Sequence, residues 1–513
     1  MRRARRLYAD REAVVDGALR LSYQQFFDRC ERWAAHLHAA GVRQGDRVAY
    51  IAPNTHANLE AFYAIPMLGA VLVPVNYRLN ADDFQYLINH SGARIVCAHG
   101  DYLDAVDSIR AALPQVTQFV ALEGARPGWL DYETALAAAN DLPPVPDMKE
   151  SDLLTINYTS GTTSRPKGVM MTHRNAWMNS VGILIHAPMT AADRYLWTLP
   201  MFHANGWTYV WTVTAVGATH VCLRKVDAAA VFDHIKRERV TMLCAAPTVL
   251  IGLANAPTEM SAGVPAGVRV ITAGAPPAAV TIGRIEQGYG WTVTQAYGLT
   301  ETAPFITVCE PRPEHDNLSS EARATIKARQ GVDLVTSGEV RVVDEQGREV
   351  PRDGQTMGEI VARGNVVMAG YFNDAAATAS AIRDGWFHTG DAAVVHEDGY
   401  IEIRDRYKDV IISGGENISS VEVEGVLLRH PAVLEVAVVG LADERWGESP
   451  HAFVVLRADA TATADELREF ARAHLAHFKV PTGYHFLDAL PKTATGKIQK
   501  YVLRRGASAA VRQ

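Results

Sequence analysis

Short apolar runs alternate with longer segments of helical periodicity up to about residue 310. Ser22 is placed to cap a helix that runs to Ala40, with Phe26, Trp33 and Leu37 on its apolar side. The elements expected after it are a strand at 47–51, a helix at 58–67, a strand at 71–75, a helix capped by Asn80 and a strand at 94–97. Because helices separate the apolar strands, the pattern predicts parallel sheets with helices on both faces, and ligand loops in such folds follow the carboxyl ends of strands.

The pattern changes after about residue 310. Short strand-like runs at 339–343 and 359–362 lie between turn residues, which is typical of antiparallel sheet or a small barrel. A compact α+β segment follows, with helices expected at 420–429 and 464–475 and strands at 434–439 and 451–456. We therefore predict an α/β chain with an N-terminal domain of residues 1–406, built of parallel-rich sheets and a small barrel-like part, and a small α+β C-terminal domain of residues 407–513.

The composition is that of an ordinary globular protein, since 48% of the 513 residues are apolar and 21% are charged. A formal net charge of −7 argues against nucleic acid as the main partner. No apolar run is long enough for a transmembrane segment, although the basic residues 1–6 leave open a weak contact with acidic lipid. The five cysteines are scattered without a CxxC pair, which favours reduced thiols in a cytoplasmic protein.

A loop rich in hydroxyl groups follows the apolar run at 153–156. Residues 158–169 contain five Ser or Thr side chains, two glycines and Lys167. Backbone N–H groups and hydroxyls of such a loop can surround the oxygens of a triphosphate, while the lysine neutralises charge. The loop is not a Walker A motif, because Pro166 precedes Lys167 and Gly168 follows it. Taken alone, the segment is also compatible with a flexible surface linker.

Two clusters in the middle of the chain carry candidate chemistry. Residues 198–207 place His203 on a glycine-containing turn, where a single histidine is more often structural than catalytic. Tyr297, Thr300 and Glu301 offer an aromatic face, a hydroxyl and a carboxylate, a set that could stack on a base, hold a phosphate and bind Mg²⁺. These three residues could equally form a turn and a helix cap.

Two further clusters lie nearer the C-terminus. Residues 385–391 end in Asp391, whose carboxylate could accept hydrogen bonds from ribose hydroxyls, although a Gly-Asp pair is also an ordinary turn. Residues 491–498 hold Lys497 on a glycine turn, where most lysines are only solvated. Each cluster is weak evidence by itself, whereas the order and spacing of all five motifs are specific.

The five motifs resemble those of the adenylate-forming superfamily, which contains acyl-CoA synthetases, luciferases and the adenylation domains of peptide synthetases. The resemblance covers nearly the whole chain. It implies that a carboxylic acid attacks the α-phosphorus of ATP to give an acyl-adenylate and pyrophosphate. The thiol of coenzyme A then takes the acyl group, which gives acyl-CoA and AMP. The resemblance therefore implies ATP, Mg²⁺ and coenzyme A as ligands.

The resemblance also implies a role for each matching residue. The grip on the β- and γ-phosphates comprises Thr159, Ser160, Gly161, Thr162, Thr163 and Lys167. The adenosine site comprises Gly274, Ala275, Tyr297 and Gly298 around adenine, with Asp391 and Arg406 at the ribose. The catalytic group comprises Thr300 at the α-phosphate, Glu301 on Mg²⁺ and Lys497 at the reacting carboxylate and α-phosphate. Lysine and Mg²⁺ would supply the positive charge that two anionic reactants require.

The resemblance further implies that the C-terminal domain is mobile and turns at Lys408. Its rotation after adenylation would withdraw Lys497 and bring Gly414 and Gly415 to the active site, where the pantetheine arm passes close to the backbone. Glu416 would then orient His203 and open the path of the thiol. An ordinary hairpin turn is the alternative interpretation of this segment.

Two departures from the general pattern point to a subgroup. Ser164 stands where the first motif usually carries Gly, and the second motif has the form Phe-His-x-Asn-Gly-Trp. Both features are similar to plant acyl-activating enzymes, benzoate-CoA ligases and methylmercaptopropionate-CoA ligases, which favour short, medium or aryl acids. The resemblance places Trp207 and Trp211 in the acyl pocket, where bulky rings disfavour a long-chain tunnel, although aromatic residues at helical spacing also form cores.

We therefore predict a cytoplasmic, AMP-forming acid–thiol ligase for a short- or medium-chain fatty acid or an aryl acid; homodimer formation stays open. The alternatives are an enzyme that loads a carrier-protein thiol, an enzyme for long-chain fatty acids, and an inactive nucleotide-binding homologue. Glu301, Asp391 and Lys497 are all present, which argues against the inactive homologue. The chain has no carrier domain after Lys497, which favours free coenzyme A.

Overall fold

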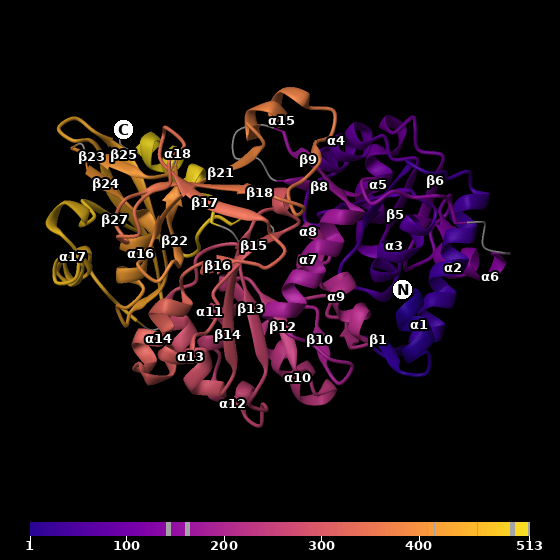
Figure 1. The fold of residues 1–513 in the computed structure, drawn as a ribbon, viewed down its shortest axis with the longest axis horizontal. Helices are drawn as coiled ribbons and strands as arrows, with labels where there is room; N and C mark the ends of the chain where they lie inside the picture. Colours follow the sequence, from indigo (N-terminus) through magenta and orange to yellow (C-terminus); the bar gives the residue numbers. More distant parts are fainter. Residues whose placement is uncertain are drawn as a thin grey trace.

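A computed structural model of the chain describes residues 1–139, 145–159, 165–407, 409–414, 416–458, 460–492 and 498–510. An eight-stranded and a nine-stranded sheet form the larger part of the molecule, and two five-stranded sheets follow along the chain (Figure 1). Helices lie between and around the large sheets, so the predicted α/β class is confirmed.

The eight-stranded sheet has the order β19-β9-β8-β4-β3-β5-β6-β7. Its strands are β3 (Arg47–Ile51), β4 (Val71–Val75), β5 (Ile95–Ala98), β6 (Gln118–Ala121), β7 (Leu130–Asp131), β8 (Leu153–Thr159), β9 (Lys167–Thr172) and β19 (Gly370–Tyr371). Strands β3 to β8 pair in parallel, whereas β9 runs antiparallel to both β8 and β19. Val48 and Tyr50 face one apolar cluster and Ala49 and Ile51 another, so both faces of the sheet are covered, as predicted.

The helices of this region are α2 (Tyr23–Ala39), α3 (His56–Met67), α4 (Ala81–Ser91), α5 (Leu103–Ile109) and α6 (Tyr132–Ala138). Helix α2 confirms the predicted start: the Ser22 hydroxyl accepts from the Gln25 N–H, and the Gln25 side chain accepts from the Ser22 N–H. Asn80 caps α4, also as predicted. Helix α3 begins two residues earlier than expected, because Thr55 supplies its cap.

The nine-stranded sheet has the order β16-β15-β14-β13-β12-β10-β11-β1-β2. Its strands are β1 (Glu12–Asp16), β2 (Leu19–Ser22), β10 (Arg194–Leu196), β11 (Thr219–Val221), β12 (Met242–Ala245), β13 (Arg269–Thr272), β14 (Thr292–Gly298), β15 (Phe305–Val308) and β16 (Val332–Asp333). The helices of this part are α1 (Arg2–Tyr8), α7 (His173–His186), α8 (Ala204–Trp207), α9 (Tyr209–Val216), α10 (Ala228–Glu238), α11 (Pro247–Ala254), α12 (Thr258–Ser261), α13 (Ala279–Tyr289) and α14 (Ser320–Lys327). The central strands β10 to β14 are parallel, so their carboxyl ends share one edge of the sheet.

The first five-stranded sheet contains β17 (Glu339–Val343), β18 (Gly358–Arg363), β20 (Ile382–Arg383), β21 (Trp386–Val395) and β22 (Ile401–Arg406), with helix α15 (Ala375–Ala381) beside it. All its pairings are antiparallel, which confirms the change of pattern after residue 310.

The last sheet contains β23 (Ile411–Ser413), β24 (Glu416–Ile418), β25 (Val433–Asp443), β26 (Gly447–Leu456) and β27 (Gly483–Phe486), with helices α16 (Ser420–Leu427), α17 (Ala464–Arg472) and α18 (Lys500–Ala510). The predicted helix to residue 475 is too long: α17 ends at Arg472, and Leu475 reaches the core from the turn that follows. Strand β22 ends at Arg406 in one sheet and β23 begins the next, while the division at 406/407 stays a prediction.

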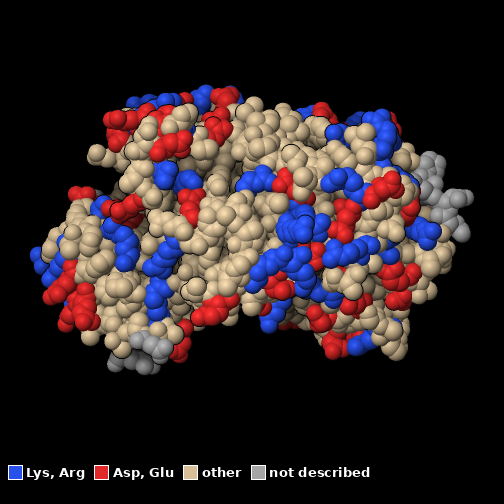
Figure 2. All heavy atoms as spheres, turned by 90° about the horizontal axis from the view of Figure 1, so that it is seen from below, with Lys and Arg blue, Asp and Glu red and all other residues tan. Residues whose placement is uncertain are grey.

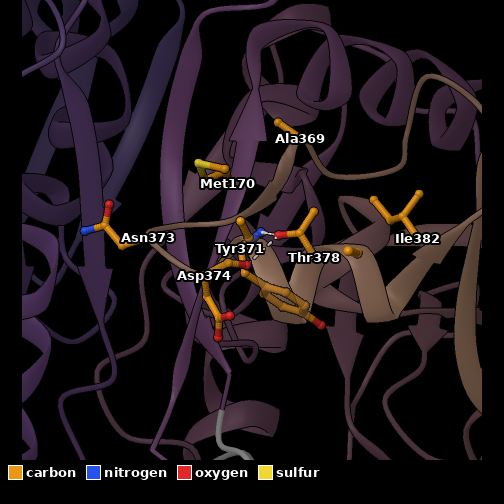
Figure 3. A pocket seen from close by; sticks show the side chains of 9 residues that line it. Met170, Ala369, Tyr371, Asn373, Asp374, Thr378 and Ile382 are labelled. Atoms are coloured by element: carbon orange, nitrogen blue, oxygen red, sulfur yellow. Dashed lines mark hydrogen bonds between the residues drawn. The ribbon is translucent and has the colours of Figure 1, made fainter.

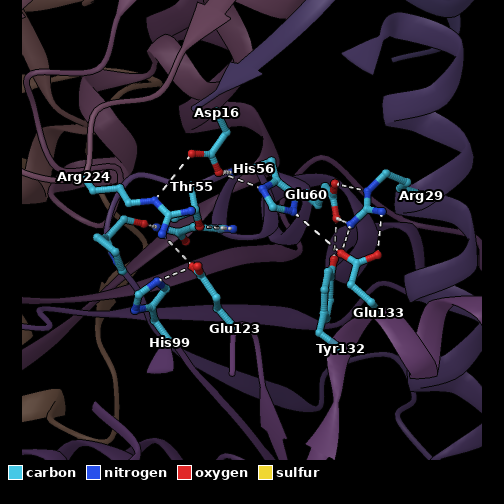
Figure 4. Close-up of polar contacts among 12 residues, drawn as sticks. Asp16, Arg29, Thr55, His56, Glu60, His99, Glu123, Tyr132, Glu133 and Arg224 are labelled. Atoms are coloured by element: carbon cyan, nitrogen blue, oxygen red, sulfur yellow. Dashed lines mark hydrogen bonds and ion pairs between the residues drawn. The ribbon is translucent and has the colours of Figure 1, made fainter. Parts of the chain in front are cut away.

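A partly buried network of charges ties α2, α3 and α6 to β1 (Figure 4). The His56 ring lies between Asp16, at 2.7 Å, and Glu133, at 3.7 Å. Arg29 pairs with the fully buried Glu60 at 2.6 Å and with Glu133 at 2.6 Å. Burial alone would lower the pKa of His56, but hydrogen bonds to the two flanking carboxylates raise it to about 9.

Positive and negative side chains are interspersed over the face in Figure 2. All five cysteines are buried. Within the described ranges, no helix combines the length and the apolar character needed to cross a membrane.

Candidate active site

The polar residues of the candidate site follow the carboxyl ends of strands from both large sheets. Thr159 ends β8, and across the antiparallel pair it faces Lys167, the first residue of β9. Gly274 and Ala275 follow β13, and Gly298 ends β14 before a short 3₁₀ turn at Thr300–Thr302. The motifs that carry these residues therefore meet at one edge of the fold, as the sequence pattern predicts for ligand loops.

A tyrosine, an aspartate and an arginine form a connected group next to this edge. The Tyr297 O–H donates to Asp391 Oδ2 at 2.6 Å, and Arg406 Nε lies 2.6 Å from Asp391 Oδ1. Asp391 and Arg406 are also opposite each other in the β21–β22 register. The structure thus brings together three residues that the sequence assigns to the adenosine site.

The electrostatics of this group fix the protonation of the tyrosine and the arginine. Burial, and then the charge of Asp391, hold the pKa of Tyr297 well above its usual range, so the phenol is a neutral donor. Burial would lower the pKa of Arg406, but Asp391 and its neighbours raise it, and the guanidinium stays charged. Asp391 is 4% exposed, so its negative charge is balanced mainly by this one arginine.

Glu301 and Lys167 meet around the side chain of Tyr371. The Tyr371 O–H donates to Glu301 Oε1 at 2.9 Å. Lys167 Nζ lies 4.9 Å from the centre of the Tyr371 ring. The Glu301 carbonyl also accepts from the Met368 N–H at 2.8 Å, which fixes the backbone from which the carboxylate extends. Tyr371 was not among the residues that the motifs single out, because it lies 70 residues from Glu301.

His203 directly precedes a left-handed turn that contains Trp207. Residues 204–208 all have positive φ, between 37° and 67°, a conformation that costs non-glycine residues about 1–2 kcal/mol each. The Asn205 side chain holds the turn by donating to Thr155 Oγ1 on β8 at 2.8 Å. Gly206 is required here, because a Cβ would lie 2.5 Å from the Trp197 ring. The sequence indicates a turn at this place but not its hand.

The two tryptophans assigned to the acyl pocket lie in different surroundings. Trp207 is 3% exposed and meets Phe305 edge-on at 5.6 Å between ring centres. A Cβ built on Gly274 would lie 3.9 Å from Trp207 Cζ2, so this indole borders the loop after β13. Trp211 is partly buried and packs edge-on against Phe62 at 6.0 Å.

The structure describes only some residues of the two motifs at 404–417 and 491–498. Ser413 pairs with Glu416 across the β23–β24 hairpin, where Glu416 is exposed, and the Gly414 N–H donates to the Trp446 carbonyl at 2.8 Å. Seven of the predicted site residues lie outside the described residues: Ser160, Gly161, Thr162, Thr163, Lys408, Gly415 and Lys497.

The chain matches two family models. The one described as AMP-binding enzyme covers residues 1–372, and the one described as AMP-binding enzyme C-terminal domain covers residues 422–497.

Three known proteins illustrate the likeness. The 4-hydroxybutyrate–CoA ligase 2 of Metallosphaera sedula is 42% identical, over 99% of this chain and 94% of that protein. A 2-methylpropanoate–CoA ligase of Humulus lupulus is 42% identical, over 98% of this chain and 93% of that protein. The structure of o-succinylbenzoate CoA synthetase from Bacillus subtilis, in complex with its acyl-adenylate intermediate, matches with a TM-score of 0.84 at 29% identity, over 98% of this chain and 97% of that one.

The family match, the relatives along nearly the whole chain and the shared fold agree with the geometry of the site. The chain belongs to the AMP-binding enzyme family, and it is an ATP-dependent, AMP-forming carboxylic acid–CoA ligase.

Proposed function

We propose that the acid activated by this enzyme is a short aliphatic carboxylic acid. The observation that carries the proposal is the position of Trp207, whose buried indole fills the space between Phe305 and Gly274. A large rigid ring at this point shortens any pocket that enters from the nucleotide side. Small aryl acids are the second candidate, because a flat ring can lie against an indole face.

The named relatives support the same range. An enzyme of Arabidopsis thaliana that is 42% identical is named for acetate and butyrate, and one of Petunia hybrida that is 38% identical is named for trans-cinnamate. With the Metallosphaera and Humulus enzymes, three of these four names specify acids of four carbons or fewer. These names favour a short acid as the substrate, and the cinnamate enzyme is the reason to assay aryl acids as well.

The described residues suggest how ATP is held. We assign the ribose to the Asp391–Arg406 pair, where the carboxylate has lone pairs left for hydroxyl donors. The adenine would lie between Tyr297 and the exposed backbone at Gly274 and Ala275, with Gly298 beside it. The phosphates would extend toward Thr159, Lys167 and the loop between them. Thr300 would contact the α-phosphate, and Lys497 would neutralise the reacting carboxylate and α-phosphate.

Glu301 fits the Mg²⁺ that the family uses. One of its carboxylate oxygens accepts from Tyr371, and among the described residues no cation forms an ion pair with Glu301. No group of three or more His, Cys, Asp or Glu ligands occurs in the described part of the chain. A single carboxylate suits Mg²⁺, which is usually held by one or two carboxylates together with substrate phosphates. The bound ion would neutralise phosphate charge as pyrophosphate leaves.

In the second half-reaction Lys497 has to leave the active site and the thiol of coenzyme A has to enter it. We therefore propose that residues 407–513 turn as a unit near Lys408. Among the described residues, the backbone N–H groups of Tyr407, Asp409 and Val410 donate to the Gly390 and Arg406 carbonyls at the boundary itself. Hydrogen bonds cross it at three further places. Asp405 Oδ2 accepts from Ser420 N at 2.9 Å and Ser420 Oγ at 2.5 Å, and the Ser419 hydroxyl donates to the Arg404 carbonyl. Arg457 donates to Asn255. Few polar bonds therefore have to break for the rotation, after which Gly414, Gly415 and Glu416 could approach His203.

We further propose that the enzyme works in the cytoplasm and forms a homodimer, which light scattering would detect as a doubled molecular mass.

The substrate proposal is tested by pyrophosphate release with straight acids from acetate to decanoate and with benzoate and cinnamate, each with and without coenzyme A. The highest kcat/KM is expected at or below butyrate. A maximum at octanoate or decanoate would contradict the proposal, and a maximum at an aryl acid would replace it with the second candidate.

A further inference from the structure

Tyr371 contacts two charged residues of the candidate ATP site, Glu301 and Lys167. Its strand, β19, extends the eight-stranded sheet by pairing with β9, the strand that begins with Lys167. The hydrogen bonds from Ala369 N–H to Met170 O and from Phe372 N–H to Gly168 O continue that pairing on both sides. The backbone of Tyr371 is therefore fixed relative to Lys167.

The segment around Tyr371 is also held from its other side. Thr378 Oγ1 accepts from the Tyr371 N–H at 2.8 Å and donates to the Asp374 carbonyl at 2.8 Å. Gly370, with φ +139°, brings the chain so close to Thr378 that a Cβ would lie 2.9 Å from Thr378 Cγ2. Tyr371 and Thr378 also line a cavity of about 580 Å³ beside α15 (Figure 3). The backbone at Gly370 and Tyr371 is thus held against Thr378.

The ring of Tyr371 is anchored in a small core. It is 9% exposed and packs with Val169, Met368 and Phe387. The packing of the ring fixes the direction of its O–H, which donates to the carboxylate of Glu301.

Glu301 and Lys167, the two charged residues next to Tyr371, do not form an ion pair with each other. Tyr371 donates to Glu301 Oε1 at 2.9 Å, and Lys167 Nζ stands 4.9 Å from the ring centre. Within the described residues, neither charged group forms an ion pair within 4.0 Å. A lysine and a glutamate this near one neighbour would attract each other if the ring were absent, and a direct pair would neutralise both.

We propose that Tyr371 is a positioning residue of the ATP site: its O–H orients the Glu301 carboxylate toward Mg²⁺, and its ring keeps the Lys167 ammonium apart from that carboxylate and directed to the phosphates. The inference rests on the proposed site and adds a residue that none of the motifs assigns. Groups that orient a metal ligand typically change metal affinity or activity 10- to 100-fold when they are lost. At the low end of the range for such contacts, a cation over an aromatic ring contributes about 0.5–1 kcal/mol, which is a factor of about two to five in affinity.

Two substitutions separate the O–H from the ring. Tyr371→Phe keeps the ring and removes the donor, so ATP binding measured by calorimetry with Mg²⁺ should weaken about tenfold. ATP binding in EDTA should change less than twofold in this variant, because Lys167 keeps its neighbour. Tyr371→Leu removes the ring as well, so binding in EDTA should also weaken by about two- to fivefold.

A third variant shows whether the effect passes through the carboxylate. In a Glu301→Gln background the metal ligand is already lost, so adding Tyr371→Phe should change Mg²⁺-dependent binding less than twofold. The control is Tyr289→Phe, which removes a hydroxyl that donates to the Leu253 carbonyl at 2.6 Å, away from the candidate site. This control should leave ATP binding unchanged under both conditions.

The outcomes are distinct. A Tyr371→Phe enzyme that binds ATP as the wild type does with Mg²⁺, or that loses affinity equally with Mg²⁺ and in EDTA, contradicts the positioning role. Additive effects of Tyr371→Phe and Glu301→Gln contradict it as well. If the wild-type enzyme itself shows no Mg²⁺-dependent gain in ATP affinity, the proposed site has failed and the role of Tyr371 falls with it.

Discussion

Replacing Trp207 by alanine should lengthen the range of acids that the enzyme accepts. The indole is 3% exposed, lies edge-on to Phe305 at 5.6 Å and borders Gly274. Removing it opens space at the point where we place the end of the acyl chain. Each methylene that then becomes buried contributes about 0.8 kcal/mol, which is a factor of about four in kcat/KM.

The magnitude follows from chain length. Hexanoate has two methylenes more than butyrate, so its kcat/KM relative to butyrate should rise about 15-fold in Trp207→Ala. Loss of a buried tryptophan also costs about 3–5 kcal/mol of folding stability, so the assay is run well below the Tm of the variant. Pyrophosphate release is measured with acetate, butyrate, hexanoate and octanoate at saturating ATP and coenzyme A.

A matched control separates pocket size from loss of stability. Trp129 is 8% exposed and meets Phe119 edge-on at 5.4 Å, so its burial and its aromatic contact are similar to those of Trp207, but it follows β6 in the other large sheet. Trp129→Ala should lower the Tm and leave the order of acids unchanged. A wild-type order of acids in Trp207→Ala, or an equal shift of that order in both variants, would refute the assignment of Trp207 to the acyl pocket.

Three other predictions test the chemistry, the hinge and the buried charges. Lys497→Ala should lower adenylation by 10²–10³ or more and leave acyl transfer from a supplied acyl-adenylate largely intact; equal loss in both half-reactions would disprove separate conformations. Lys408→Pro should fix φ at the hinge, block acyl-CoA formation and spare acid-dependent pyrophosphate release, so unimpaired acyl-CoA formation would disprove the hinge. His56→Gln should destabilise the fold more at pH 6 than at pH 10. The raised pKa of His56, about 9, means that its contribution, on the order of 3 kcal/mol, is complete below about pH 6.5 and is lost as the pH rises through 9. Urea unfolding of both proteins from pH 6 to pH 10 measures this, and curves that stay parallel would exclude the imidazolium role.

Local signals in the sequence were enough for much of the fold. The side chain of Ser22 and the glutamine three residues later determine the start of α2 without help from distant parts of the chain. The apolar run at 47–51 became β3 with the same bounds. The end of α17 was missed because Leu475 continues the apolar spacing after the helix has stopped, and periodicity does not distinguish a turn that packs from a helix that packs.

The site was predictable where a motif is local and not where it depends on distant contacts. The Tyr297–Asp391–Arg406 group could be assembled only by the resemblance, since its members come from three strands and two sheets. Tyr371 gives no local signal, because its partners Lys167 and Glu301 reach it through tertiary packing. The left-handed turn at 204–208 depends on Asn205 bonding to β8, which no sequence window contains.

Activation of a carboxylic acid through an enzyme-bound acyl-adenylate is the reaction that we assign to this chain. Exchange of labelled pyrophosphate into ATP, measured with butyrate and Mg²⁺ in the absence of coenzyme A, tests it most directly. We predict exchange that depends on the acid and stops in its absence, and equal amounts of AMP and butyryl-CoA once coenzyme A is added. Formation of ADP and phosphate, or acyl-CoA formation without any acid-dependent exchange, would contradict it.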